Sequence, residues 1–490
     1  MQFKKSMLMK NFLTVISLFI FLIGKAQTTI SDEKSTEVDN YIENIMSEQK
    51  IPGLALAITY NGKVLKKETY GLSSIEYNVP VTDSSTFWMA SVSKHFTATA
   101  IMQLFEKGVL DLDDDIHKHL PDAPDYWKGI TIRHLLTHTS GLPDTRKASA
   151  WGERSAIGTY SAELIYKNAK KDTLAFNPGE DFLYSDEGIY LLGYIIHKVS
   201  GLSFNDYMDK MIFKPSGMQS AYMMNHFKIH PNQATGYSIK NEEIIPDRNA
   251  YRLIDAELIS SGGIYATIDD MINWESAMTN NLLLTQKSKD LMWSTYKLKN
   301  GHPTQYGFCW YTQTIQHKRI ICHYGVAGTE YLRFADDKIS IIVLTNQAKY
   351  ERAILHRIAE ILNVSPVISG KDIKTGTVIS SVPKEKDIQM LVGEYEFTPN
   401  ENYYIEGNLM MDIMLKENEL WIEYPAKEKY RKKYKLAKLE NGRWIQLSFE
   451  PIFVETSFEI LKTNKDISVK VYEDYNIGYD IHVGELKKVN

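Results

Sequence analysis

A serine and a lysine three positions apart are the first residues of this chain whose types and spacing could perform catalysis. Ser91 and Lys94 stand where a stretch of helical periodicity begins, over residues 94–107, and a spacing of three puts both side chains on one helix face. A serine becomes a nucleophile when a neighbouring amine takes its proton, and a helix N-terminus offers a backbone N–H and a favourable dipole to an oxyanion. The pair predicts covalent catalysis, although a Ser-x-x-Lys sequence occurs by chance in many chains.

Further segments make this motif specific. In chain order they are Gly108-Val-Leu-Asp-Leu, residues 130–143, Asn177-Pro-Gly-Glu, Tyr184-Ser-Asp, Ser261-Gly-Gly, His323-Tyr-Gly and Leu344-Thr-Asn. Over roughly residues 35–360 the chain resembles the serine β-lactamase and penicillin-binding protein superfamily, and within it the class C β-lactamase-like branch of esterases and D-aminopeptidases. The resemblance implies an acyl-enzyme at Ser91 and a small-molecule or peptide substrate, with no metal and no organic cofactor.

The resemblance also assigns roles around a second motif. Tyr184 matches the tyrosine of the family's Tyr-x-Asn, which lies against the lysine and helps to move the proton from the serine to the leaving group. The third position is Asp186 instead of Asn, and a carboxylate cannot donate a hydrogen bond to the acyl-amide oxygen of a β-lactam. Asp186 therefore disfavours β-lactamase activity. It could hold Lys94 protonated, attract a substrate amine, or be a tolerated variant with an unchanged role.

A third motif, His323-Tyr324-Gly325, takes the place of the family's Lys-Thr-Gly and is similar to the esterase and aminopeptidase variants. By this resemblance the backbone N–H of Val326 completes an oxyanion hole with that of Ser91. A neutral His323 attracts a substrate carboxylate less than a lysine does. The pattern therefore disfavours a carboxypeptidase that reads a free C-terminus.

Three other patterns imitate functional motifs, and each favours an ordinary interpretation. A literal Lys374-Thr375-Gly376 follows the Leu344-Thr-Asn strand, whereas the family's motif precedes it. His134 and His138 share an i, i+4 face that could bind zinc, but the glutamate of His-Glu-x-x-His is missing and no third ligand is evident, which favours a structural pair. The acidic run at residues 111–115 lacks the glycine that a calcium loop needs next, so it predicts a helix-capping turn.

The elements that must position these residues indicate an α+β fold. Residues 31–363 alternate amphipathic helical stretches, such as 189–199 and 269–279, with strand-like runs. Asn61-Gly62 between two such runs is a strong hairpin signal. The mixture predicts an antiparallel sheet flanked by helices, with a helical lobe, in a β-lactamase/transpeptidase-like domain.

The C-terminal part differs in composition. Residues 364–386 are rich in turn formers and charge and predict a linker, and residues 387–490 are almost entirely strand-like. We expect a small all-β domain, a lipocalin-like barrel, which resembles the β-barrel appendages that border the active-site cleft in some members of the superfamily.

Charge and the N-terminus bear on partners and compartment. The 490 residues carry a formal net charge of −5, which argues against a nucleic-acid partner. Lysines, an apolar run over residues 12–23 and small residues before Gln27 predict a signal peptide at residues 1–26, and the run is too short to span a bilayer. We expect an exported protein, periplasmic or secreted, with no stable membrane insertion after cleavage. The sequence does not determine the oligomeric state.

The two cysteines leave an alternative open. Cys309 and Cys322 fall on runs that read as paired strands, 308–311 and 320–323, and an oxidising compartment would permit a cross-strand disulfide. Two buried free thiols fit the sequence equally well.

Two classes of function remain. The first is a serine hydrolase that acts on an ester or amide, such as a D-amino-acid peptide or amide, a small ester or a β-lactam-like compound, with esterase or peptidase activity ahead of true β-lactamase activity. The alternative is a non-catalytic ligand-binding or cell-wall-sensing member of the superfamily, which the unusual Asp186 suggests.

Overall fold

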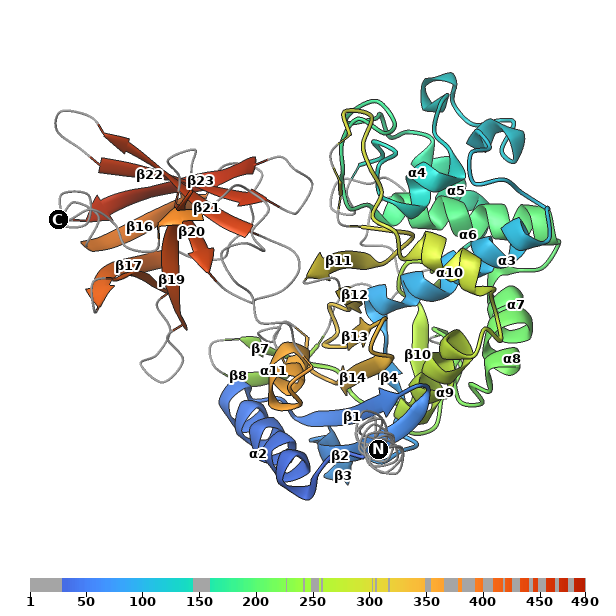
Figure 1. Ribbon diagram of the computed structural model, residues 1–490. Helices are drawn as coiled ribbons and strands as arrows, with labels where there is room; N and C mark the ends of the chain where they lie inside the picture. The colour runs from blue at the N-terminus through green and yellow to red at the C-terminus, as the bar shows by residue number, and fades with distance from the viewer. Residues whose placement is uncertain are drawn as a thin grey trace, which may run out of the picture.

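The described part of the chain comprises an N-terminal region and a set of C-terminal strands (Figure 1). In this computed structural model the described residues are 29–143, 159–225, 227–240, 243–247, 255–256, 259–301, 303–304, 306–315, 318–348 and 354–364, and the strands β15 to β23 given below. The predicted signal peptide and Lys374-Thr375-Gly376 lie outside these residues.

The centre of the N-terminal region is a seven-stranded sheet in the order β11-β12-β13-β14-β1-β2-β3. The strands are antiparallel neighbours: β1 (Gly53–Tyr60), β2 (Lys63–Ser74), β3 (Val79–Pro80), β11 (Tyr311–Ile315), β12 (Lys318–Tyr324), β13 (Glu330–Phe334) and β14 (Ile339–Thr345). The predicted hairpin is confirmed, since Asn61 and Gly62 both take the positive φ that a tight turn between β1 and β2 requires.

Helices cover both faces of this sheet (Figure 1). On β1 the larger residues Leu54, Leu56 and Ile58 join one apolar cluster, and Ala55 and Ala57 between them join another, as the period of a strand dictates. The first cluster includes residues of α2 (Asp32–Gln49) and α11 (Ile354–Ile361). The second includes residues of α3 (Lys94–Glu106), α6 (Asp186–Ser200) and α9 (Ile268–Thr279). Burial on both faces explains why β1 is apolar almost throughout.

The helical lobe and a small second sheet complete this region. The lobe adds α4 (Ile132–Leu136), α5 (Ala162–Ala169), α7 (Phe204–Tyr207), α8 (Lys214–Ser216) and α10 (Gln286–Met292). The small sheet has the order β4-β10-β6, from β4 (Phe87–Trp88), β10 (Ile264–Ala266) and β6 (Tyr222–Met223). Because β4 leads directly to Ser91 and β10 follows Ser261, this sheet brings two distant motifs together.

The C-terminal strands form a nine-stranded antiparallel sheet. They are β15 (Val378–Ser380), β16 (Gly393–Pro399), β17 (Leu409–Lys416), β18 (Glu419–Tyr424), β19 (Lys432–Leu439), β20 (Trp444–Leu447), β21 (Glu455–Lys462), β22 (Ile467–Asp474) and β23 (Asp480–Val489). From β16 to β23 each strand pairs with its neighbours in sequence, and the β16–β23 pairing closes the ring. The predicted α+β architecture with an all-β, barrel-like C-terminal part is confirmed.

The two cysteines are free, buried thiols. Cys309 lies in the apolar cluster with α3 and α6, and Cys322 lies in the cluster with α2 and α11. The expected strand pairing over residues 308–311 is wrong, because β11 begins at Tyr311 and Cys309 sits before it with a φ of 59°. The disulfide alternative therefore does not hold in this structure. Burial raises the pKa of the Cys309 thiol to about 12.

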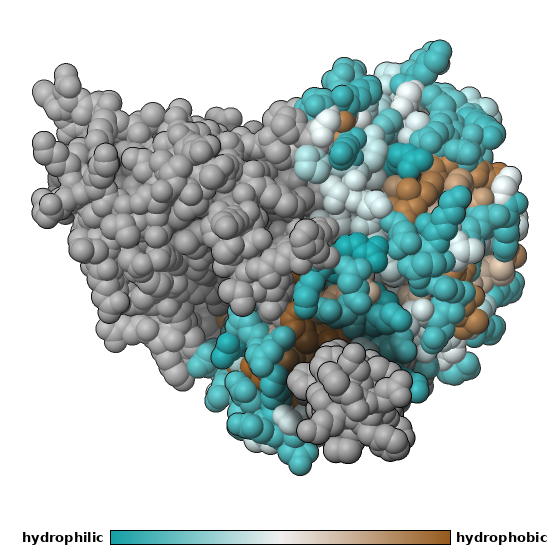
Figure 2. Space-filling view, in the orientation of Figure 1, coloured by the Kyte–Doolittle hydropathy of each residue, from teal (hydrophilic) through white to brown (hydrophobic). Residues whose placement is uncertain are grey.

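The face of the N-terminal region seen in Figure 2 is mostly hydrophilic, with apolar residues gathered in a few patches. One cavity of about 430 Å³ lies between the start of α2, β1, β14 and the end of α11, and Ile58, Leu65 and Leu362 are among its lining residues. It contains none of the predicted site residues. No helix in the described part of the chain has the length and apolar character needed to cross a bilayer.

Candidate active site

Ser91 lies in a tight turn immediately before helix α3. The turn is a 3-10 segment, Ala90–Ser93, and Ala90 adopts a φ of 44°, which is uncommon for a residue with a side chain. Two hydrogen bonds join this turn to β10: Met89 N–H donates to the carbonyl of Ile264 at 2.8 Å, and Ile264 N–H donates to Ser93 Oγ at 3.2 Å. Ser91 is therefore held on a fixed turn at the N-terminal end of α3, with its side chain half-buried.

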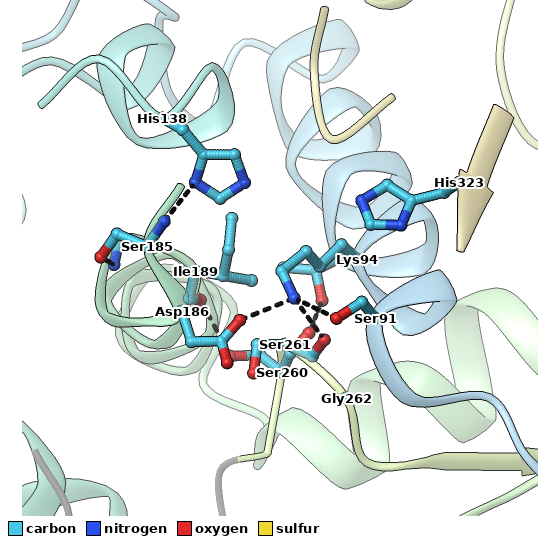
Figure 3. A network of polar contacts seen from close by, with 12 residues as sticks. Ser91, Lys94, His138, Ser185, Asp186, Ile189, Ser260, Ser261, Gly262 and His323 are labelled. Carbon is cyan, nitrogen blue, oxygen red and sulfur yellow. Dashed lines mark hydrogen bonds and ion pairs between the residues drawn. The ribbon is translucent and has the colours of Figure 1, made fainter. Parts of the chain in front are cut away.

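Lys94 is fully buried and its amine contacts three oxygen atoms (Figure 3). Nζ lies 3.0 Å from Ser91 Oγ and 3.0 Å from the carbonyl oxygen of Ser261. It also forms an ion pair with Asp186, at 2.6 Å from Oδ1. Two of these contacts are hydrogen bonds that the ammonium donates, and the third is the ion pair with the carboxylate. The nucleophile and a carboxylate are thus connected through one amine.

Helix α6 positions Asp186 and Tyr184. Ser185 caps this helix, because its Oγ accepts a hydrogen bond from Gly188 N–H at 3.4 Å, and Asp186 is the first helical residue. A carboxylate is favourable in the first turn of a helix. Tyr184 precedes the cap, and the centroid of its ring lies 4.9 Å from Lys94 Nζ. The second motif therefore meets Lys94 with both its carboxylate and its aromatic ring.

Gly325 permits β12 to end against the serine turn. A Cβ at this position would lie 2.6 Å from the carbonyl oxygen of Met89 and 3.1 Å from Ala90 Cβ, which is too close for any other residue. Gly325 N–H donates to Thr329 at 2.7 Å, so a compact turn follows and carries Val326, whose side chain is 44% exposed. Within the described part of the chain the N–H of Val326 meets no acceptor.

His323 is buried beneath this edge of the site and has no open face for a solvated anion. Its Nε2 lies 3.1 Å from the hydroxyl of Tyr306, and its Nδ1 lies 3.0 Å from the backbone N–H of Tyr324. The ring faces the side of the site where Ser91 and Lys94 lie (Figure 3). Burial raises the pKa of Tyr306 well above 10, so its hydroxyl remains protonated at neutral pH. This arrangement supplies no fixed positive charge of the kind that a lysine would bring.

The expectation of one helical face for His134 and His138 is wrong. Helix α4 ends at Leu136, so the two rings do not share a face. His134 belongs to the capping box of that helix, with Thr131 N–H donating to His134 Nδ1 at 3.2 Å, whereas His138 contacts the second motif. In the described residues no three His, Cys, Asp or Glu side chains gather to hold a metal ion. The acidic run does supply a cap, since Asp115 accepts from His117 N–H at 2.9 Å.

Sequence reasoning missed two contributors to the site. Ser261 belongs to the Ser261-Gly-Gly motif, but a backbone carbonyl acceptor leaves no side-chain signature in a sequence. Tyr306 carries no signal at all, because its contact with His323 depends on how β11 and β12 bring the two residues together. All seven predicted residues nevertheless lie on three segments, 91–94, 184–186 and 323–326, that meet around Lys94 and the Ser91 turn.

An antiparallel sheet between helices, with a buried lysine joining a serine to a second motif, defines the class of serine β-lactamase-like proteins. The chain belongs to the Beta-lactamase family, whose model matches residues 38–363. It is similar to penicillin-binding protein 4* of Bacillus subtilis, with 29% identity over 358 residues that cover 69% of this chain and 78% of that protein. Protein flp of Staphylococcus aureus is 26% identical over 337 residues, which cover 66% of this chain and 63% of flp.

Solved structures support the same fold. The octameric penicillin-binding protein homologue from Pyrococcus abyssi aligns with a TM-score of 0.61 and 23% identity, over 92% of this chain and 100% of that one. EstCE1, described as a hydrolase with promiscuous acyltransferase activity, aligns with a TM-score of 0.59 and 22% identity, over 68% of this chain and 98% of its own.

Proposed function

We propose that the protein is a serine hydrolase that forms an acyl-enzyme at Ser91. The observation that carries this proposal is the line of contacts from Ser91 Oγ through Lys94 Nζ to Asp186 Oδ1, at 3.0 and 2.6 Å, in a site where the lysine is fully buried. Burying an unpaired charge costs folding free energy, and here the lysine charge is paired with Asp186. The pair lies beside Ser91, where a nucleophilic serine requires a base.

Asp186 supplies the proton acceptor that an ammonium alone lacks. Lys94 passes a proton to Asp186 across the ion pair and takes the proton of Ser91 in its place. The serine oxygen then bonds to the substrate carbonyl carbon, and the carbonyl electron pair moves onto its oxygen. The N–H groups of Ser91 and Val326 stabilise this oxyanion.

Tyr184 completes the proton transfer. When the tetrahedral intermediate collapses, the bond to the leaving group breaks, and the proton that left Ser91 reaches that group through the phenol beside Lys94. Water then attacks the acyl-enzyme, gives its proton to the same lysine and carboxylate, and restores Ser91. Over the whole cycle the enzyme itself neither gains nor loses a proton.

The substrate is an ester or amide that is not anchored by a carboxylate. His323 is buried and bonded to Tyr306, and Lys94 is already paired, so neither offers a free cation to a peptide C-terminus. We rank small esters and D-amino-acid peptides or amides ahead of β-lactams, because Asp186 replaces the amide donor of the family's second motif.

Export and domain organisation are further parts of the proposal. The leader-like residues 1–26 direct the protein out of the cytoplasm, to the periplasm or the medium, and cleavage leaves no stable membrane insertion. Residues 31–363 form the hydrolase domain, residues 364–386 the linker, and residues 387–490 a β-domain that limits substrate size. A stable truncated protein without residues 387–490 that keeps the full-length substrate profile would refute that role.

A non-catalytic binding protein is the second candidate, and one observation favours it: the ammonium of Lys94 is paired with Asp186 and has no lone pair to accept a proton until one of its own protons moves to Asp186. Turnover of p-nitrophenyl acetate and of D-alanyl p-nitroanilide by the wild type and by Ser91→Ala separates the two. Hydrolysis lost in Ser91→Ala supports the hydrolase. Equal background rates in both proteins, with an unchanged melting temperature, favour the binding protein.

A further inference from the structure

His138 holds the second motif through its backbone and its ring. Its carbonyl accepts a hydrogen bond from Leu183 N–H at 2.9 Å, and its Nδ1 accepts one from Ser185 N–H at 3.2 Å. These two bonds lie on either side of Tyr184. The residue has a φ of 56°, in the left-handed region, which turns its side chain toward this segment.

The hydrogen bond from Ser185 fixes the tautomer of the imidazole. A backbone N–H can only donate, so Nδ1 carries no proton and a neutral ring carries it on Nε2. Nε2 is buried and has no hydrogen-bond partner among the described residues. In Figure 3 this nitrogen faces the space in which Lys94 and His323 lie. Burial, followed by the charge of Lys94, holds the pKa of His138 well below 6.5, so the ring stays neutral.

The same ring packs on aromatic residues of the site. Its centroid lies 4.4 Å from that of Tyr184, with the planes inclined by 37°, and 4.9 Å from that of Tyr306. His138 is 1% exposed, so these contacts exclude water from one side of the Tyr184 ring. A displacement of the ring would therefore move the phenol relative to Lys94.

We propose that His138 is a positioning residue for the second motif. Its unprotonated Nδ1 fixes the peptide bond between Tyr184 and Ser185, which precedes Asp186, and its ring fixes the orientation of Tyr184. This inference rests on the proposed acyl-enzyme chemistry, in which Tyr184 and Asp186 move the proton. Of the two ring nitrogens, Nδ1 is the one that holds the second motif, and the N–H at Nε2 is not required for this role.

Two substitutions separate the two nitrogens. In His138→Asn the side-chain oxygen replaces Nδ1 as acceptor, and asparagine tolerates the left-handed backbone. In His138→Gln the amide reaches the position of Nε2 and the Nδ1 acceptor is lost. The rate at which a fluorophosphonate labels Ser91 should fall by about 100-fold in His138→Gln, because displacements near 1 Å at reacting groups cost about that much. His138→Asn should lose less, about 10-fold, since it restores the hydrogen bond from Ser185 but not the packing of the ring on Tyr184.

His134→Gln is the matched control, since His134 stands in the same segment and caps α4 away from the nucleophile. Its labelling rate should match the wild type, and melting temperatures of all variants verify folding. A His138→Gln protein that outperforms His138→Asn, or equal rates in both, would overturn the inference. If His138→Gln does not fold, a 100-fold loss in folded His138→Asn overturns it as well. Wild-type protein that resists labelling would instead contradict the proposed function itself.

Discussion

Lys94 and Arg333 are buried cations of the N-terminal region that each pair with a carboxylate, and they differ in what the cation can do. Lys94 and Asp186 are 0% and 15% exposed in the site, and Arg333 and Glu275 are 4% and 0% exposed between β13 and α9. Glu275 also accepts hydrogen bonds from Tyr331 and from Thr279, at 2.7 Å for the latter, so both of its carboxylate oxygens have partners. Arginine cannot release a proton in a protein, whereas lysine can. The same charge pattern therefore fastens a helix to the sheet in one place and permits proton transfer in the other.

Replacing the lysine of the Lys94–Asp186 pair by arginine, as in the Arg333–Glu275 pair, should have the largest effect on the reactivity of Ser91. Lys94→Arg keeps a positive partner for Asp186 but removes the proton relay, so we expect fluorophosphonate labelling of Ser91 to slow by about 10²–10⁴-fold. Lys66→Arg is the matched control, because Lys66 pairs with Asp39 at 2.8 Å far from the nucleophile in sequence and is also largely buried. Equal labelling of both variants and the wild type would show that Lys94 needs only its charge.

Breaking the structural pair should reduce stability without changing the chemistry. Glu275→Gln leaves the charge of Arg333 buried without a counter-ion, and such a loss costs about 3–5 kcal/mol of unfolding free energy. Urea denaturation measures it, with Asp122→Asn as the control, because Asp122 and Lys170 form an exposed pair worth about 0–1 kcal/mol. At temperatures where Glu275→Gln is folded, Ser91 should be labelled at the wild-type rate. A Glu275→Gln protein as stable as Asp122→Asn would contradict the structural role of the Arg333–Glu275 pair.

Neutralising the carboxylate of the catalytic pair should slow the turnover of every substrate, because Asp186 accepts the relay proton, and should change the preference between substrates by a smaller factor. Asp186→Asn restores an amide donor at the family's position, and one added hydrogen bond is worth about tenfold in rate. The ratio of penicillin acylation to p-nitrophenyl acetate turnover should rise by about that factor. Asp39→Asn, in the Lys66 pair, should leave the ratio unchanged. A ratio that does not move in Asp186→Asn would mean that this position does not select the substrate.

The sequence was sufficient for the fold class and for the residue types at the site, because these depend on local patterns. The Asn61-Gly62 hairpin, the helix that carries Lys94 and the strand-rich C-terminal part all follow from short-range signals. The partner of Asp186 was left open among alternatives, because that contact joins residues on different helices. The boundaries of the signal peptide, the linker and the domains stay predictions.

The errors have one physical cause. His138 and Cys309 both take a left-handed backbone conformation, His138 shortly after the end of α4 and Cys309 shortly before the start of β11. Neither residue is a glycine, so nothing in the local sequence signals the turn. Tertiary contacts, such as the hydrogen bond from Ser185 to His138, stabilise these conformations.

The central claim is that Ser91 is an activated nucleophile, and one measurement tests it without a choice of substrate. The intact mass of the purified protein is recorded before and after incubation with a fluorophosphonate, beside Ser91→Ala as the control. The account predicts a single adduct on the wild type and none on the variant. A folded wild-type protein that gains no adduct, or a Ser91→Ala protein that gains the same one, would contradict it.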